Sequence, residues 1–505
     1  MMGSLTAVPR SSRETPGKRK VFPVYQEYGG NALVPKFYLH RYGIGSPTES
    51  AEPRIDAAFQ VPFVGKLQPD QMKGTRDALA ILKARHGVFL QGRCGSGKTV
   101  VGTFLISKIP GGRTVIMVDQ TEIAAQWAEQ IRAHLPSATI SFVMPMDSQK
   151  AICKKLNLPT SGRQNIDFDG RVVIVMAETL MRVPLAKPID AVLLIVDEAH
   201  SFSAERFSAT IYHFNFRYSV ALTATERRSD GLEWIFQSLL GTEVAHLEGK
   251  RIQAAVLALA APSVKITKDE HRMYFCDQYR EVTSQWRCSQ RCNPTAPCVF
   301  LRGDGTKIDY SSVWQRISED EQYNGWIVNL VSMLYRYGRH AVVFGKYKAH
   351  LKRLREETIK IGVPREHTAL YFAGMDKEKS TTPQITFATY GKVQKAVDLP
   401  HKDAALFAMP ISDAQQPMGR IERYLPGKIQ TVLIEPVLAN VEPLARIFWG
   451  HCSFYRKENY VVIRTDPQGA DHWLAACHQG HQRATGPDPG EQGVRPGSPD
   501  VHQGG

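Results

Sequence analysis

The feature that most constrains this chain is the segment GRCGSGKT at residues 92–99, which fits the phosphate-loop pattern G-x-x-x-x-G-K-[ST] at every fixed position. An apolar run precedes it and a helical pattern follows, as this pattern requires. Its glycines, Gly92, Gly95 and Gly97, let the backbone curl so that N–H groups face phosphate oxygens. Lys98 is expected to contact the β- and γ-phosphates, and Thr99 to offer its hydroxyl to Mg²⁺.

Short apolar runs alternate with helical patterns on both sides of this loop. One series lies at residues 87–90, 114–118, 172–176 and 191–196, and a second at 341–344, 385–389, 404–408 and 431–434. Such runs are typical of strands buried on both faces of a parallel sheet. Their alternation with helices predicts an α/β fold with two tandem parallel-sheet domains.

The expected organisation has five parts. Residues 1–60 form an N-terminal extension, 61–244 the nucleotide-binding domain, 245–318 a cysteine-bearing connector and 319–465 the second domain, followed by a tail at 466–505. The tail is rich in turn residues and lacks apolar periodicity, so we expect it to be disordered.

Composition narrows the class of protein. Lys and Arg number 63 against 49 Asp and Glu, a net charge of +14 over 505 residues. This excess suggests a polyanionic partner, although a solubility charge explains it equally well. No apolar run approaches the roughly 18 residues that span a bilayer, so no membrane partner is expected. Eight cysteines in so long a chain do not form a disulfide framework, which predicts a reducing, intracellular location.

An acidic pair supplies the metal partner that a phosphate loop of this kind needs. Asp197 and Glu198 directly follow the apolar run at residues 191–196. Ligands bind at the carboxyl edge of open α/β sheets. We therefore expect Asp197 to hold Mg²⁺, and Glu198 to orient or deprotonate the attacking water. Taken alone, the pair could simply end a strand and cap a helix.

Together with Lys98 and Thr99, the sequence Asp-Glu-Ala-His at residues 197–200 resembles the DEAH box of superfamily 2 helicases and translocases. Further segments resemble the family's motifs in the family's order, at residues 67–71, 118–127, 223–225 and 416–423. Residues 222–232 are similar to the branch that contains XPB-like repair helicases and helicases of phages and large DNA viruses. The resemblance covers about residues 31–465. It implies two RecA-like domains, a P-loop NTPase fold, ATP and Mg²⁺ as cofactors, and nucleic acid as partner.

The resemblance also implies roles for residues around the nucleotide. Gln71 would contact the adenine, and Gln416 would belong to the nucleotide site. Arg420 and Arg423, in the segment that resembles motif VI, would reach the γ-phosphate.

Other matched residues would couple ATP hydrolysis to movement along a strand. These are Thr223 and Thr225 of the segment resembling motif III, and Asp398 of the segment resembling motif V. The chain departs from the family pattern at Glu226, where Pro is usual, and at Ala396, where Gly is usual. Gly permits close backbone approach, so Ala396 is expected to weaken this coupling.

These observations predict an ATP-dependent DNA helicase or translocase, in the virion or in the host nucleus or cytoplasm if the chain is viral. Alternatives are an RNA helicase and a duplex-DNA translocase of a repair or restriction complex. Glu226 and Ala396 motivate a further alternative, a catalytically weak scaffold that binds nucleic acid.

Three features remain open. Cys276, Cys288, Cys292 and Cys298 could form a zinc site. Their spacing lacks the paired C-x₂-C pattern, so free cysteines are the favoured interpretation. The basic stretch at residues 350–360 is either a nucleic-acid track or, as we favour, a solvated outer face. Trp127 either stacks on a base or, as we favour, belongs to the core.

Overall fold

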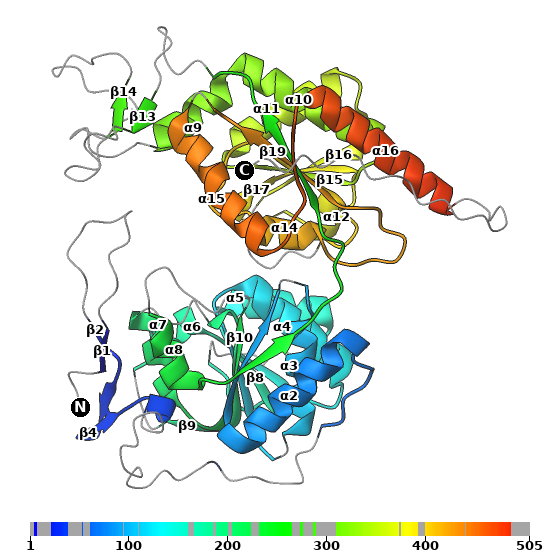
Figure 1. Ribbon diagram of the computed structural model, residues 1–505. Coiled ribbons are helices and arrows are strands. Elements are labelled where there is room, and N and C mark those ends of the chain that lie inside the picture. The colour runs from blue at the N-terminus through cyan, green and yellow to red at the C-terminus, as the bar shows by residue number, and fades with distance from the viewer. Residues whose placement is uncertain are drawn as a thin grey trace. The chain divides into compact units, whose positions relative to one another are not determined.

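The structure is a computed structural model that describes residues 5–7, 22–38, 53, 61–93, 95–109, 111–159, 166–184, 188–199, 205–223, 232–264, 273–275, 286–288, 310–372, 375–391, 399–439 and 441–485. The chain divides into two compact units (Figure 1). Unit 1 comprises Met1–Ile252, Tyr390–Pro400 and Asp413–Tyr424. Unit 2 comprises Gln253–Thr389, His401–Ser412 and Leu425–Gly505.

Unit 1 contains a seven-stranded sheet in the order β11-β5-β10-β9-β6-β8-β7, in which every neighbouring pair is parallel. Its strands are β5 (Gly87–Gly92), β6 (Thr114–Val118), β7 (Ile140–Val143), β8 (Val172–Met176), β9 (Ile189–Val196), β10 (Phe214–Thr223) and β11 (Val244–Leu247). Its helices include α2 (Pro69–Arg85), α3 (Lys98–Lys108), α4 (Thr121–His134), α5 (Met146–Leu156), α6 (Ala177–Leu180), α7 (Glu205–Thr210), η3 (Ile211–His213) and α8 (Glu233–Leu240).

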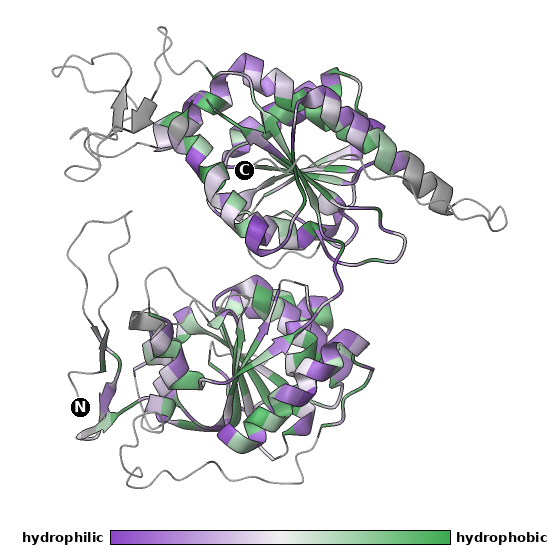
Figure 2. Ribbon diagram, viewed as in Figure 1, coloured by the Kyte–Doolittle hydropathy of each residue, from purple (hydrophilic) through white to green (hydrophobic). Residues whose placement is uncertain are grey.

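Two apolar clusters cover the two faces of this sheet. One includes Leu82, Leu105 and Ile131 from α2, α3 and α4, and the other includes Ile235 and Leu239 from α8. Because both faces are covered, β6 and β8 are buried along their whole length. Figure 2 shows the resulting pattern, with apolar strands inside and polar helix surfaces outside.

Unit 2 contains a second seven-stranded parallel sheet, in the order β16-β17-β15-β18-β19-β12-β20. Its strands are β12 (Ala255–Ala260), β15 (Ala341–Gly345), β16 (Thr368–Tyr371), β17 (Ile385–Thr389), β18 (Ala404–Phe407), β19 (Val432–Val437) and β20 (Val462–Thr465). Its helices include α9 (Tyr310–Glu319), α10 (Glu321–Arg336), α11 (Lys348–Lys360), η5 (Arg365–His367), α12 (Lys377–Thr381), α15 (Glu442–Lys457) and α16 (Pro467–Thr485).

Short strand pairs complete the described elements. They are β1 (Thr6–Ala7) with β2 (Phe22–Pro23), β3 (Gln26–Tyr28) with β4 (Asn31–Leu33), and β13 (Met273–Phe275) with β14 (Trp286–Cys288). Within the described ranges, no helix is long and apolar enough to cross a membrane.

The predicted α/β fold with two tandem parallel sheets is confirmed. The segment expected to be a connector, residues 245–318, instead contributes strands to both sheets. β11 runs beyond residue 244 and pairs with β5, while β12 pairs with β19 and β20. β12 is a short apolar run, AVLALA, and its buried residues fit a position between two strands.

The tail expected to be disordered from residue 466 instead begins with a helix, α16. Ala470 and Leu474 are spaced by four residues and are fully buried, so one side of this helix packs on unit 2. The turn-rich composition that suggested disorder belongs to residues beyond 485, which lie outside the described residues.

His350 gives unit 2 a pH-dependent stability. This histidine of α11 is 3% exposed, and its Nε2 lies 2.7 Å from Asn324 Oδ1. Burial, together with the charge of Arg353, lowers the pKa of His350 from 6.5 to about 4. Between those values the unfolded chain binds a proton that the folded chain does not, so stability falls as pH falls.

We expect this linkage to remove up to about 3 kcal/mol of stability between neutral pH and pH about 4. Urea denaturation across this range measures the slope. His350→Gln should flatten it, because glutamine does not titrate, whereas His472→Gln on an exposed position of α16 should not. Equal slopes for His350→Gln and the wild type would contradict the assignment.

Candidate nucleotide site

The phosphate loop connects β5 to α3 at the carboxyl edge of the first sheet. Gly95 and Gly97 have φ of 86° and 80°, in the left-handed region that glycine enters without strain. A methyl group at Gly97 would overlap the side-chain amide of Gln71. The motif's glycines are therefore required by backbone conformation and by close packing around the loop.

Lys98 is folded back onto the loop. Its side chain is 9% exposed, and Nζ donates to the carbonyl oxygens of Gly92 at 2.6 Å and Arg93 at 3.1 Å. The ammonium group therefore lies where the backbone curls. A bound phosphate would offer charged oxygens in place of these neutral carbonyls, which makes stronger hydrogen bonds.

Asp197 ends β9 and is held by two hydrogen bonds. Its Oδ1 accepts from the backbone N–H of Glu198 at 2.9 Å, and its Oδ2 accepts from Trp127 Nε1 at 2.8 Å. Asp197 is 7% exposed and Trp127 is fully buried. Burial raises the pKa of Asp197 and the charge of Glu198 adds to this, while the Trp127 hydrogen bond, the charge of Lys98 and the Glu198 backbone N–H lower it, and the net pKa is about 6.

Glu198 has an unusual backbone. Its φ is 47°, left-handed for a residue with a side chain, and its side chain is half-buried. Such conformations cost on the order of 1–3 kcal/mol and persist where the surroundings impose them, often at active sites. The strain therefore lies at the position expected to act on the attacking water.

The oxygen groups here suit Mg²⁺. Asp197 offers a carboxylate, and Thr99, at the second position of α3, offers a hydroxyl. Mg²⁺ prefers oxygen ligands and is commonly bound by one or two protein groups together with water and phosphate. Among the described residues, no cluster of three or more His, Cys, Asp and Glu could hold a metal. Where Mg²⁺ is bound, Asp197 and Thr99 would hold it.

The segment that resembles motif VI includes α14 (Gln415–Ile421) and belongs to unit 1 although its neighbours in sequence belong to unit 2. The backbone N–H of Ile252 donates to Glu422 O at 2.9 Å, and Arg251 forms an ion pair with the Glu422 carboxylate at 3.4 Å. The Arg423 side chain contacts the phosphate loop, since a methyl group on Gly95 would come within 2.9 Å of it.

Three other residues predicted for the nucleotide site lie on α14 and α2. Arg420 is 8% exposed and Gln416 is half-buried, both on α14. Gln71 is 8% exposed, and its Nε2 donates to Ser96 O at 3.3 Å while its Oε1 accepts from Gln68 N at 3.0 Å. Gln71 therefore contacts the backbone of the phosphate loop, and its role toward adenine stays a prediction.

Of the predicted coupling residues, Thr223 ends β10 beside Gln91 of β5 and is 2% exposed. Five further residues lie outside the described residues. They are the coupling residues Thr225 and Asp398, the departures from the family pattern Glu226 and Ala396, and His200, the last residue of the DEAH-like box. So do Cys276, Cys292, Cys298 and the side chain of Cys288, so the zinc prediction is not addressed.

The basic helix α11 fits the interpretation of a solvated outer face. Arg353 pairs with Glu357 at 2.9 Å, and Arg355 pairs with Glu356 at 3.3 Å and donates to Thr368 at 3.0 Å. These arginines are already engaged by carboxylates and by a hydroxyl of unit 2 itself.

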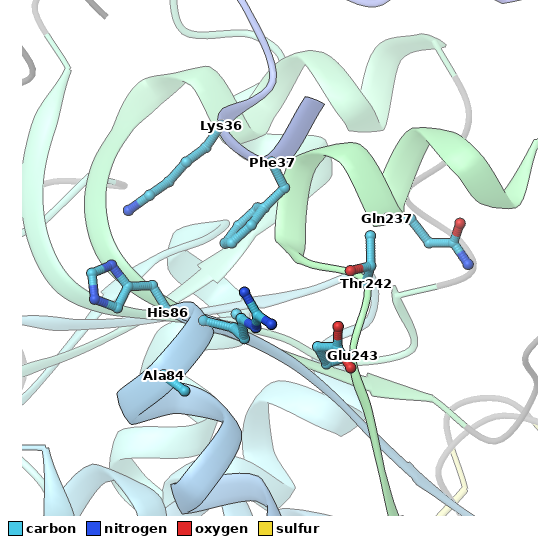
Figure 3. A pocket seen from close by; sticks show the side chains of 9 residues that line it. Lys36, Phe37, Ala84, His86, Gln237, Thr242 and Glu243 are labelled. Atoms are coloured by element: carbon cyan, nitrogen blue, oxygen red, sulfur yellow. The ribbon is translucent and has the colours of Figure 1, made fainter. Parts of the chain in front are cut away.

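A pocket of about 590 Å³ lies at the other end of β5, where the strand begins (Figure 3). Lys36, Phe37, His86 and Glu243 are among its lining residues. Lys36 Nζ donates to the carbonyl oxygens of Phe216 and Arg217, at 2.9 and 2.8 Å, and so helps to attach the N-terminal segment to β10. The phosphate loop follows the opposite end of β5, so this pocket is separate from it.

Trp127→Phe is expected to weaken the site by removing the indole N–H while keeping the core filled. A buried carboxylate that loses a hydrogen bond costs about 1–3 kcal/mol. We expect a lower thermal midpoint and a higher Mg²⁺ concentration for half-maximal ATP turnover. Thermal denaturation and an Mg²⁺ titration measure the two effects. An unchanged Mg²⁺ requirement would show that the hydrogen bond does not help position Asp197.

The contact between Trp127 and Asp197 is a feature that the sequence did not reveal. The segment at residues 118–127, which resembles one of the family's motifs, ends at Trp127, but nothing in the sequence links an α4 residue to the end of β9. β9 and β6 are neighbours in the sheet, and α4 follows β6. The sheet order brings the two together.

Comparisons with known proteins find matches that include the phosphate loop. The family described as type III restriction enzyme, res subunit, matches residues 65–228, which contain the phosphate loop and the acidic pair. A putative ATP-dependent RNA helicase of Acanthamoeba polyphaga mimivirus is 20% identical over 459 residues, covering 88% of this chain and 78% of the relative. A putative helicase of Invertebrate iridescent virus 6 is 27% identical over 247 residues, covering 46% and 50%.

Among solved structures, S. cerevisiae Dbp5 bound to RNA and ADP BeF3 is similar, with a TM-score of 0.50 and 12% identity. The match covers 82% of this chain and 97% of that one. At this identity the similarity describes the fold, two parallel-sheet domains in tandem.

Proposed function

We propose that this chain, whose residues 65–228 match the type III restriction enzyme res-subunit family and whose relatives are named putative helicases, is a superfamily 2 helicase that works as an ATP- and Mg²⁺-dependent motor on DNA. The observation that carries this proposal is the set of groups around the phosphate loop. Lys98, the Asp197–Glu198 pair and Arg423 all belong to unit 1, and Arg423 contacts Gly95.

Each group has a distinct task in phosphoryl transfer. Lys98 leaves its carbonyl partners and binds the β- and γ-phosphate oxygens. Glu198 orients the attacking water and accepts its proton at the carboxylate. Arg423 and Arg420 stabilise the charge that spreads over the transferred phosphoryl group.

Mg²⁺, when bound, neutralises charge on the phosphates. Asp197 would hold this Mg²⁺. Its carboxylate is fixed in orientation, because the Trp127 indole N–H and the Glu198 backbone N–H donate to its two oxygens. The neutral indole fixes one oxygen without adding a positive charge that would compete with the metal.

DNA is the proposed nucleic acid because residues 222–232 resemble helicases of phages and large DNA viruses, and because viral relatives match. RNA is the second candidate, since the mimivirus relative is named a putative RNA helicase. Contacts with the strand are proposed to fall mainly on phosphates, so binding weakens as salt rises.

The deciding experiment measures ATP turnover with single-stranded DNA, duplex DNA and RNA, followed by displacement of a labelled strand from substrates with 3′ or 5′ tails. We expect DNA to stimulate turnover most and one tail polarity to support displacement. Stimulation by RNA alone would replace DNA with RNA as the substrate. Stimulation by duplex DNA without displacement would favour a translocase.

A further inference from the structure

The solvent-facing side of α15 in unit 2 carries a tryptophan among basic residues. Arg446, Trp449, Ser453 and Arg456 are spaced by three or four residues, which places them on one face of the helix, and all are exposed. Trp449 is 49% exposed. The opposite side is buried, with Leu444, Phe448 and Tyr455 at 3% exposure or less.

Arg464 of the neighbouring strand β20 extends this surface. Its guanidinium lies 4.9 Å from the centre of the Trp449 ring. Burial raises the pKa of the Cys452 thiol and the charge of Glu435 adds to this, while the charges of Arg464 and Arg456 oppose it. Arg456 Nε also donates to the backbone carbonyl of Cys452 at 3.4 Å, so basic groups of both α15 and β20 lie around Cys452.

No acidic residue interrupts the helix from Arg446 to Lys457. The one acidic residue of α15, Glu442, lies at its first position. The α15 face is thus basic over about three turns.

An exposed tryptophan on such a face needs a physical reason, because burying its large apolar surface would be favourable. Tryptophan and arginine both offer flat surfaces on which a nucleobase can stack, and base–aromatic stacking is largely independent of sequence. Arginine also pairs well with phosphate oxygens. The tryptophan and arginines of this face therefore offer both a stacking surface for a base and partners for phosphate oxygens.

We propose that this surface, formed by Arg446, Trp449, Ser453, Arg456 and Arg464, binds a single strand of nucleic acid. A base stacks on the exposed part of Trp449 and the arginines contact the flanking phosphates. A single strand fits because its bases are unpaired and can lie on a side chain, whereas bases within a duplex cannot. This inference rests on the proposed function in taking nucleic acid as the partner.

The test is fluorescence anisotropy of labelled single-stranded DNA and RNA with the full chain. Trp449→Ala is expected to weaken binding about tenfold, a loss within the range of one stacked base. Trp449→Phe should recover most of this loss, because phenylalanine keeps an aromatic face. Arg464→Ala should weaken binding. It should also reduce the slope of log affinity against log salt concentration by about one, the amount expected for one lost phosphate contact.

The matched control is Arg365→Ala, which removes an exposed arginine elsewhere in unit 2 and should leave binding unchanged. Thermal denaturation shows whether each variant folds. If Trp449→Ala does not fold, the binding of Arg464→Ala still decides the test. Wild-type affinity in both Trp449→Ala and Arg464→Ala would overturn this inference. Absence of binding by the wild-type chain would instead overturn the proposed function.

Discussion

Lys98→Ala is expected to abolish ATP turnover while leaving unit 1 folded. Lys98 is the cation that we propose to meet the phosphates, and removing one such group from a transition state costs about 10²–10³ in rate, which would leave turnover close to background. The fold should survive because, among the described residues, the hydrogen bonds of Lys98 go to two backbone carbonyls of its own loop. Steady-state phosphate release measures the loss, and thermal denaturation measures the fold.

Lys108→Ala is a matched control for this variant. Lys108 is the last residue of the same helix, α3, is exposed, and lies over the ring of Phe104. Its loss should leave turnover near the wild-type rate. Equal turnover by Lys98→Ala and the wild type would mean that the phosphate loop is not the site of hydrolysis.

Arg423→Ala is expected to lower ATP turnover about 10³-fold or more, the range in which arginine fingers act. A methyl group added at Gly95 would come within 2.9 Å of Arg423 Cγ and Nε, and this proximity to the phosphate loop supports the proposal that Arg423 acts on a bound γ-phosphate. Nucleotide affinity should change much less than the rate, because the arginine acts on charge that develops in the transition state.

Binding of a fluorescent ATP analogue separates these two effects. Arg182→Ala removes an exposed arginine that pairs with Glu178 in unit 1, and it should leave both affinity and rate unchanged. If Arg423→Ala reduces affinity and rate by the same factor, Arg423 binds the ground state and is not an arginine finger.

The sequence predicted the fold class because apolar runs in buried parallel strands are easy to recognise. β6 and β8 are five-residue runs with every residue buried, and both lie within predicted segments. β10 was missed although it lies between β5 and β9 in the sheet. Its first half carries Asn215 and Arg217, which break the apolar pattern.

Some features of the site could also be predicted from local sequence, and others could not. Spacing alone locates Lys98 and Asp197, because the motifs are contiguous in sequence. The hydrogen bond from Trp127 to Asp197 joins residues 70 positions apart. The contact of Arg423 with Gly95 depends on a segment, Asp413–Tyr424, that belongs to unit 1 although the residues on both sides belong to unit 2. Such contacts follow from tertiary packing, which local patterns do not encode.

The most direct test of the ATP-driven motor is steady-state ATP turnover by the wild type and Lys98→Ala, with and without single-stranded DNA. We expect the wild type to turn over ATP slowly alone and several-fold faster with the strand, and Lys98→Ala to show neither rate. Turnover that no nucleic acid changes, or that survives in Lys98→Ala, would contradict an ATP-driven motor built on this phosphate loop.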